Sequence, residues 1–232
     1  MGRGRGRGRG KASITASPVA SAIEPSSGAA CYQTFYDGVN DYFISTEAAL
    51  KFSGAMTAAI EINLSSQSSQ DTYFWNRPDA TGGFMLKGFL NNNLYGIVSG
   101  SAVNSQAIAP TNSLTNGSWL KILMTCGDAD TTKIYINGSL VGTAPTSATM
   151  GASASTFFMG TAGDAPSRAF HGYMRNATIM SGKTSTPSSW VPTDPSSLVG
   201  CTEVMYSLKG NDENRNSLTF SKVGDPITSE CA

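Results

Sequence analysis

The chain has 232 residues, of which 40% are hydrophobic and only 14% are charged. This length fits one large all-β domain or two small ones, and the charged fraction is well below the usual quarter of a soluble chain. Ser, Thr, Asn, Gly and Ala fill the difference, which is typical of turn-rich β proteins with neutral polar surfaces. No apolar run reaches the roughly 18 residues of a transmembrane helix, so we expect none.

The formal net charge of zero conceals an uneven distribution. The first eleven residues contain five basic side chains and no acid, namely Arg3, Arg5, Arg7, Arg9 and Lys11. The chain has 16 basic and 16 acidic residues in all, so 11 basic residues face 16 acidic ones in the remainder. A cationic arm on an anionic body suggests two partners or two roles.

The arm alternates Gly with Arg, and we expect it to be flexible because Gly is costly to order and like charges repel. Arginine binds phosphates bidentately, so the arm predicts salt-dependent, sequence-independent affinity for nucleic acid. Three other interpretations stay open: a solubilising tail, a cloning artefact, or an anchor in an acidic groove of a neighbouring subunit. No apolar segment of a secretory signal follows the arm, so we expect the protein to remain where it is made, or to leave by cell lysis or in an assembled particle.

The β signals begin at Ala30. We therefore divide the chain into an arm and linker, 1–29, and one domain, 30–232, with Pro18 and Pro25 interrupting the linker. Short segments rich in β-branched and aromatic residues recur between Gly, Asn, Asp and Pro, and they predict strands. The predicted strands are 31–36, 41–45, 56–64, 72–76, 83–90, 93–99, 118–126, 132–137, 139–143, 155–160, 169–180, 202–208 and 217–221. With no crossover helices between them, these strands predict an all-β, antiparallel two-sheet sandwich or a barrel.

Three local patterns carry more detail. Residues 56–64 (MTAAIEINL) alternate in part and predict a half-buried strand. Asn137-Gly138 predicts a tight type I′ hairpin. Residues 45–51 predict one short helical turn capped by Ser45 or Thr46.

The four cysteines do not have metal-binding spacing. Cys126 lies in an apolar run and is predicted to be a buried thiol. Cys31 and Cys201 each precede a predicted strand, so a disulfide between them stays open, as does the state of Cys231.

Four segments, in order, resemble the concanavalin A-like, laminin-G-like jelly-roll superfamily. They are FYDGVNDYF (35–43), SGAMTAAI (53–60), WLKI (119–122) with KIYINGSLV (133–141), and FMG (158–160) with FHGYMRNATI (170–179). The resemblance implies a jelly-roll sandwich closed by a C-terminal strand pair beside the first strand. It says little about a site, because the motif residues have folding roles.

Some members of this superfamily are glucanases with paired carboxylates on one strand. No such spacing occurs here, and Glu61 is the only acid on its strand, so we predict no catalytic residue and no enzyme activity. The single histidine, His171, is predicted to be a sandwich-edge residue rather than a general base.

We expect no cofactor and no resident metal. Legume-lectin-like members of the superfamily bind calcium through loop Asp and Asn residues. Asp128 with Asp130, and the run 211–214 (NDEN), offer suitable oxygens, which leaves calcium as a minor alternative.

A ligand or glycan surface is a further possibility. Tyr73, Trp75, Asn76 and Arg77 combine aromatic rings with amide and guanidinium groups, and simple alternation places Tyr73 and Trp75 on the face opposite Phe74. The same face also fits a subunit contact or a patch covered by a loop. Trp190 is expected to hold its own loop against the sandwich.

Together these features favour a non-enzymatic structural or adhesive component of a virus particle, such as a capsid, decoration or tail-associated protein, located in the virion. Its arm would anchor to neighbouring subunits or genome, and symmetric copies are expected. The alternatives are a carbohydrate-binding, lectin-like module and a nucleic-acid-binding protein that acts through the arm.

Overall fold

The computed structural model describes residues 32–67, 70–76, 82–100, 103–163, 165–182, 184, 205–207 and 220–230, and these residues are mainly β-strand. The strands are β1 (Tyr32–Asp37), β2 (Tyr42–Ser45), β3 (Met56–Leu64), β4 (Thr72–Trp75), β5 (Phe84–Phe89), β6 (Asn93–Ser99), β7 (Asn104–Ile108), β8 (Trp119–Cys126), β9 (Asp130–Ile136), β10 (Ser139–Ala148), β11 (Phe157–Met159), β12 (His171–Ser181), β13 (Met205–Ser207), β14 (Ser221–Val223) and β15 (Ile227–Glu230). Three short 3₁₀ turns accompany them: η1 (Ala48–Leu50), η2 (Leu90–Asn92) and η3 (Pro166–Arg168). Within the described ranges, no helix has the length and apolarity to cross a membrane.

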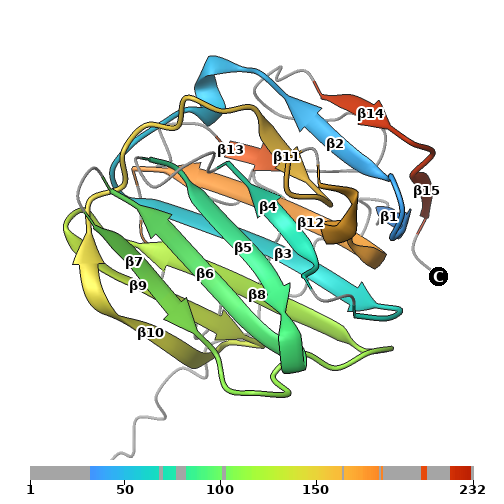
Figure 1. Cartoon of the computed structure of the whole chain (residues 1–232), viewed down its shortest axis with the longest axis horizontal. Coiled ribbons are helices and arrows are strands. Elements are labelled where there is room, and N and C mark those ends of the chain that lie inside the picture. Colours follow the sequence, from blue (N-terminus) through green and yellow to red (C-terminus); the bar gives the residue numbers. More distant parts are fainter. Residues whose placement is uncertain are drawn as a thin grey trace, which may run out of the picture.

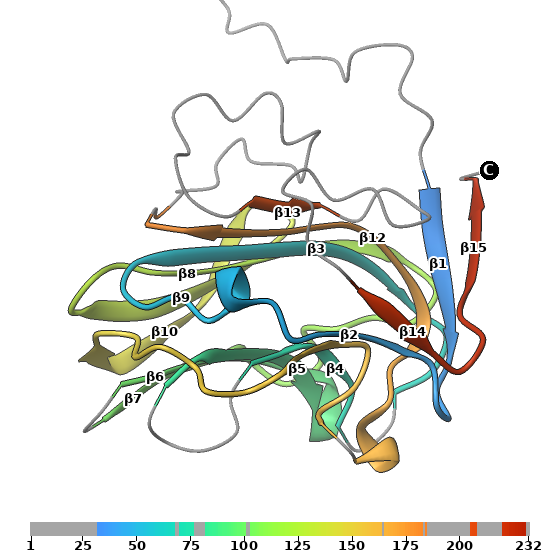
Figure 2. The same ribbon diagram turned by 90° about the horizontal axis from the view of Figure 1, so that it is seen from above.

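The strands form two antiparallel sheets that face each other (Figures 1 and 2). Sheet A has the order β10-β9-β8-β3-β12-β1-β15, with β13 paired to β12, and sheet B has the order β14-β2-β11-β4-β5-β6-β7. The chain crosses between the sheets several times: β1 and β2 belong to different sheets, whereas β4–β7 all lie in sheet B and β8–β10 all lie in sheet A. The predicted antiparallel jelly-roll sandwich is confirmed. The arm and linker, 1–29, lie outside the described residues.

The main core lies between the sheets. Met56, Ala58, Ile60, Ile62 and Leu64 of β3 all belong to it, as the alternation in this segment predicts. The expectation that β3 is half-buried is wrong, because Thr57, Ala59 and Glu61 on its other face are also buried. β3 is a central strand between β8 and β12, and Ala59 forms a second small apolar cluster with Leu123 and Tyr135.

The predicted hairpin is present between β9 and β10. Asn137 (φ 50°) and Gly138 (φ 83°) adopt the positive φ angles that a type I′ turn requires, and Ile136 pairs with Ser139. The short turn predicted in 45–51 is also present, as η1. The predicted cap residue, Ser45 or Thr46, is wrong, because Glu47 occupies the N-cap position. Ser45 Oγ accepts a hydrogen bond from the Glu47 amide.

Two strands were not predicted. β7 has a mixed polar sequence that carries little strand signal, yet it pairs with β6 along its whole length. β15 pairs with β1, so a C-terminal strand does lie beside the first strand. The strand predicted at 217–221 begins later, as β14, and it pairs with β2 instead.

Cys126 is 1% exposed, which confirms the predicted buried thiol. Burial also raises the pKa of this thiol above its ordinary value, which disfavours the reactive thiolate. Cys31, Cys201 and Cys231 lie outside the described residues.

The two sheets approach closely at Gly96 of β6. A Cβ atom at this position would lie 2.5 Å from Ile134 Cγ2 and 2.8 Å from Met124 Sδ, both from sheet A. These distances are well inside van der Waals contact, so the close approach of β6 requires a residue without a side chain.

We expect Gly96→Val to lower the free energy of unfolding by about 1–3 kcal/mol, because overpacking forces neighbouring side chains from their rotamers. Urea unfolding of the purified chain measures this. Thr143→Val on exposed β10 is the matched control, and it should change stability by less than about 0.5 kcal/mol. Equal stability of the two variants would contradict the sheet packing described.

Candidate functional site

The candidate site originates in a β-bulge in β4. Thr72 pairs with Lys87 of β5, but the next pair is Phe74 with Leu86, so Tyr73 is an extra residue in the ladder. A bulge of this kind reverses the alternation of side chains beyond it. Tyr73 and Phe74 therefore both enter the main core, and Trp75 is directed to the outer face of sheet B.

The bulge overturns part of the predicted ligand surface. Tyr73 is fully buried, and its ring packs against Phe170 at a centroid distance of 5.6 Å, so its predicted exposure is wrong. Asn76 is also buried, and its side-chain amide donates to the Leu50 carbonyl oxygen. Arg77 lies outside the described residues. Of the three described residues, Trp75 is the one that remains half-exposed.

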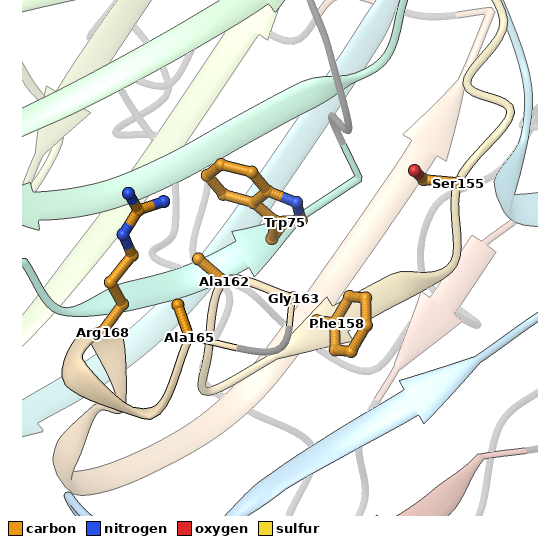
Figure 3. A pocket seen from close by; sticks show the side chains of 7 residues that line it. All are labelled: Trp75, Ser155, Phe158, Ala162, Gly163, Ala165 and Arg168. Carbon is orange, nitrogen blue, oxygen red and sulfur yellow. The ribbon is translucent and has the colours of Figure 1, made fainter.

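Trp75 lines an open pocket of about 440 Å³ (Figure 3). This volume lies within the range of about 300–1,000 Å³ that is usual for small-molecule sites. The lining residues share small or aromatic side chains with one cation among them, and they are Trp75, Ser155, Phe158, Ala162, Gly163, Ala165 and Arg168. They come from β4, from β11 and its preceding loop, from the segment between β11 and η3, and from η3 itself.

Strand pairing positions the two aromatic rings. Phe158 of β11 is the direct cross-strand partner of Trp75, and its ring lies 6.0 Å from that of Tyr42 on β2. The pairing places both rings of the pocket on one face of the sheet. Phe158 was noted only as part of a strand motif, because a single strand does not show which strand will lie beside it.

Arg168 forms the opposite wall. Its backbone amide donates to the Ala165 carbonyl oxygen at 3.0 Å, which fixes the η3 turn. Its guanidinium carbon lies 5.7 Å from the centroid of the Trp75 ring, within the range of a cation–π contact. No sequence pattern indicated Arg168, because it belongs to a short turn and reaches Trp75 only through the tertiary fold.

The pocket has the chemistry of a binding site. It offers aromatic faces, a hydroxyl on Ser155 and an arginine fork, with small residues that leave room for a ligand. A mostly apolar concavity with a few convergent polar groups is the usual form of a small-molecule site. It contains no carboxylate or histidine among its described lining residues.

The acidic residue of β3 has a structural partner. The Glu61 carboxylate is buried, Arg175 Nε donates to it at 2.7 Å, and Asn176 Nδ2 lies 3.3 Å from its other oxygen. The Arg175 guanidinium also stacks 3.9 Å from the centroid of the Trp119 ring. Glu61 is therefore engaged in an ion pair on the face of sheet A that does not meet sheet B.

His171 is half-buried at the start of β12, an inner strand of sheet A between β3 and β1, so it lies at a strand end and not on an edge strand as expected. Its Nδ1 is 2.7 Å from Ser66 Oγ, and its ring meets Phe35 edge to face at 5.9 Å. A serine–histidine pair suggests nucleophilic chemistry only when a third group orients the base. In the described part of the chain, no carboxylate is hydrogen-bonded to this ring, so the pair lacks that third group.

Three carboxylates, from Asp37, Asp41 and Asp225, lie within 4.8 Å of one another. Buried Asp41 accepts hydrogen bonds from the backbone amides of Asp37 (2.9 Å) and Asp225 (2.8 Å). Its carboxylate therefore joins the β1–β2 turn to the β14–β15 turn, across the two sheets.

The calcium candidates in the sequence lie elsewhere. Asp130 is 3.6 Å from Lys133 Nζ and accepts a hydrogen bond from the Thr131 amide. Residues 211–214 lie outside the described residues. Calcium binding by Asp128 and Asp130 stays a prediction.

Comparison with known proteins identifies the fold family. Residues 37–188 match the family model of the concanavalin A-like lectin/glucanases superfamily. None of the curated proteins matches the sequence significantly.

Two solved structures share the fold at low sequence identity. A heptameric, SAP-like pentraxin from Limulus polyphemus superposes with a TM-score of 0.56 and 14% identity, over 86% of this chain and 95% of the pentraxin chain. A Bacteroides ovatus protein to which carbohydrate binding is attributed superposes with a TM-score of 0.56 and 18% identity, over 85% of this chain and 61% of its own.

The Asp41 carboxylate gives a pH-dependent prediction. Burial raises its pKa above the ordinary 3.8, and the two amide hydrogen bonds oppose that rise only in part. The folded state thus binds the Asp41 proton more tightly than the unfolded state does. Relative to Asp41→Asn, the unfolding free energy of the unchanged protein should fall as pH rises from 3.8 through the raised pKa.

Urea unfolding of both proteins between pH 3.5 and pH 7 measures this difference. Above the raised pKa the difference should become constant. An opposite slope, in which the unchanged protein gains relative stability as pH rises, would mean that the amide hydrogen bonds outweigh burial.

Proposed function

The chain belongs to the concanavalin A-like lectin/glucanases superfamily, and from that premise we propose that it is a non-enzymatic, glycan-binding module. Trp75 carries the proposal, because its indole is half-exposed and lines an open pocket on the outer face of sheet B. The apolar face of a sugar ring packs on such an indole, and Ser155 and Arg168 supply hydrogen-bond donors beside it.

The structural roles of two described acids, Glu61 and Asp41, support the proposal that the module is non-enzymatic. Hydrolysis of a glycosidic bond requires two carboxyl groups that flank it. Glu61 is paired with Arg175, and Asp41 is buried against two backbone amides. Neither lines the pocket. The fold neighbour from Bacteroides, to which carbohydrate binding is attributed, is consistent with a binding role.

We expect Trp75→Ala to weaken binding to the glycans recognised on an array by at least about tenfold, because an aromatic anchor contributes more than about 1.4 kcal/mol. Isothermal titration of one recognised glycan gives the value. Trp75→Phe should retain part of the affinity. Tyr73→Phe is the control, because that ring is buried and its loss of a hydroxyl should leave binding unchanged.

Thermal unfolding of each variant confirms that it is folded. If Trp75→Ala is folded and binds as the unchanged chain does, the pocket is not the glycan site. If the unchanged chain binds no glycan, the proposed function itself is wrong.

A second candidate function rests on the arm. We propose that the chain is a component of a virus particle, anchored through Arg3, Arg5, Arg7, Arg9 and Lys11 to nucleic acid or to neighbouring subunits, with the sandwich available to glycans. The supporting observation is the concentration of five of the 16 basic residues in the first eleven positions. The pentraxin neighbour, which is heptameric, is consistent with oligomeric assembly of such a sandwich.

Replacement of these five residues by Gln in the full chain should abolish binding to single-stranded DNA. For the unchanged chain, log K should fall against log salt with a slope of about −3.5, as expected for five contacts to a single strand. Fluorescence anisotropy measures both quantities. Unchanged DNA affinity in the Gln variant would exclude the arm as the contact, and a strict monomer by light scattering would count against the particle.

A further inference from the structure

The strands of sheet B contain no acidic residue. None of the seven segments β2, β4, β5, β6, β7, β11 and β14 includes Asp or Glu. Sheet A, by contrast, carries an acid in β1, β3, β9 and β15. The face that bears the pocket is thus neutral or cationic along its strands, although the body of the chain is acidic overall.

An apolar row crosses this face through the pocket. Strand register places Ile44, Phe158, Trp75, Met85 and Ile97 side by side on five successive strands. Met85 and Ile97 are buried but are not part of the core between the sheets. Phe158 and Trp75 are the aromatic centre of the row, and both line the pocket.

Two cations flank the row. Arg168 stands over Trp75. Lys87 lies two residues beyond Met85 on the same face of β5, about 7 Å along the strand, where its Nζ donates to Gln70 Oε1 and lies 4.7 Å from the Phe89 centroid. A ligand that binds on Trp75 would therefore lie close to the positive charge of Arg168, and Lys87 lies farther along the same face.

The guanidinium of Arg168 has no carboxylate partner in the described part of the chain. Lys133 is paired with Asp130 and Arg175 with Glu61, and no carboxylate among the described residues is paired with Arg168. The cation–π contact with Trp75 holds the guanidinium beside the pocket and leaves its N–H donors for another partner. An arginine held in this way is suited to bind an oxyanion through two parallel hydrogen bonds.

We propose that the pocket selects acidic sugars. The pyranose ring packs on Trp75 and Phe158, and the oxyanion of the sugar, a carboxylate or a sulfate, is bound by the Arg168 fork. This inference rests on the proposed glycan-binding function and adds the charge of the ligand to it.

Recognition of single-stranded nucleic acid also combines aromatic stacking with positive charge. Proteins that bind single strands supply successive aromatic platforms along a basic groove. Here the neighbours of Trp75 across β5 and β6 are aliphatic, Met85 and Ile97, and one arginine serves the pocket. The observations therefore favour a single acidic ring over a strand of bases.

The test uses the full chain with its five arm cations replaced by Gln, so that the arm does not contribute to anion binding. Isothermal titration compares a neutral oligosaccharide with its uronate and sulfated counterparts of matched length. We expect the acidic sugars to bind at least about tenfold more tightly than the neutral one. Comparison of the uronate with the sulfated sugar identifies which oxyanion is preferred. This preference should weaken with added salt.

Arg168→Met should remove the preference, because it should weaken acidic-sugar binding far more than neutral-sugar binding. Arg168→Lys should keep only part of the preference, because an ammonium lacks the bidentate fork. Trp75→Ala should weaken both kinds of sugar. Asp164, which is next to Gly163 and Ala165 in sequence, lies outside the described residues, and Asp164→Asn should preserve the preference.

The outcomes separate the two proposals. Neutral and acidic sugars bound equally through Trp75, or an acidic preference unchanged in Arg168→Met, would overturn the charge selectivity and leave the glycan site in place. Absence of any Trp75-dependent sugar binding would overturn both. Binding of oligo-dT that is lost in Trp75→Ala would assign the pocket to nucleic acid.

Discussion

One extra residue in β4 decides which aromatic side chains build the core and which reach the surface. In a regular strand, Tyr73 and Trp75 would share one face and Phe74 would have the other. With the bulge, Tyr73 and Phe74 both enter the core, where Tyr73 packs on Phe170 and Phe74 lies 6.0 Å from Phe157. Trp75 is left as the aromatic side chain of β4 on the outer face, and the pocket forms around it.

The bulge is held by contacts from outside β4. The Gly160 amide donates to the Tyr73 carbonyl oxygen, which ties the extra residue to the segment after β11. Gly88 leaves space for the Tyr73 hydroxyl, since a Cβ there would approach that oxygen to 2.8 Å. Core and site are therefore coupled, because the packing that buries Tyr73 is also what turns Trp75 outward.

This coupling explains what the sequence could and could not predict. The strand pattern, the Asn137-Gly138 hairpin and buried Cys126 follow from local preferences, and all three were confirmed. The bulge has no local signal, because Tyr73 is not a glycine and its contacts lie 15 and more residues away in sequence. Arg168 was missed for the same reason. β7 was missed because pairing with β6, rather than its own composition, makes it a strand.

Glu61 and Asp41 hold parts of the sandwich together. Their positions also affect the charge of the outer face of sheet B. Glu61 fastens β3 to the bulged region of β12 through Arg175, and Asp41 joins two turns that belong to different strand pairs. Because these carboxylates take part in an ion pair and in hydrogen bonds, their negative charge is located at sheet A and at the turns. The outer face of sheet B, with acid-free strands, can then present an indole and an arginine to a ligand without an internal competitor in its strands. β1, the first described strand, belongs to sheet A, whereas β4 and β11, which supply the aromatic rings of the pocket, belong to sheet B (Figure 2).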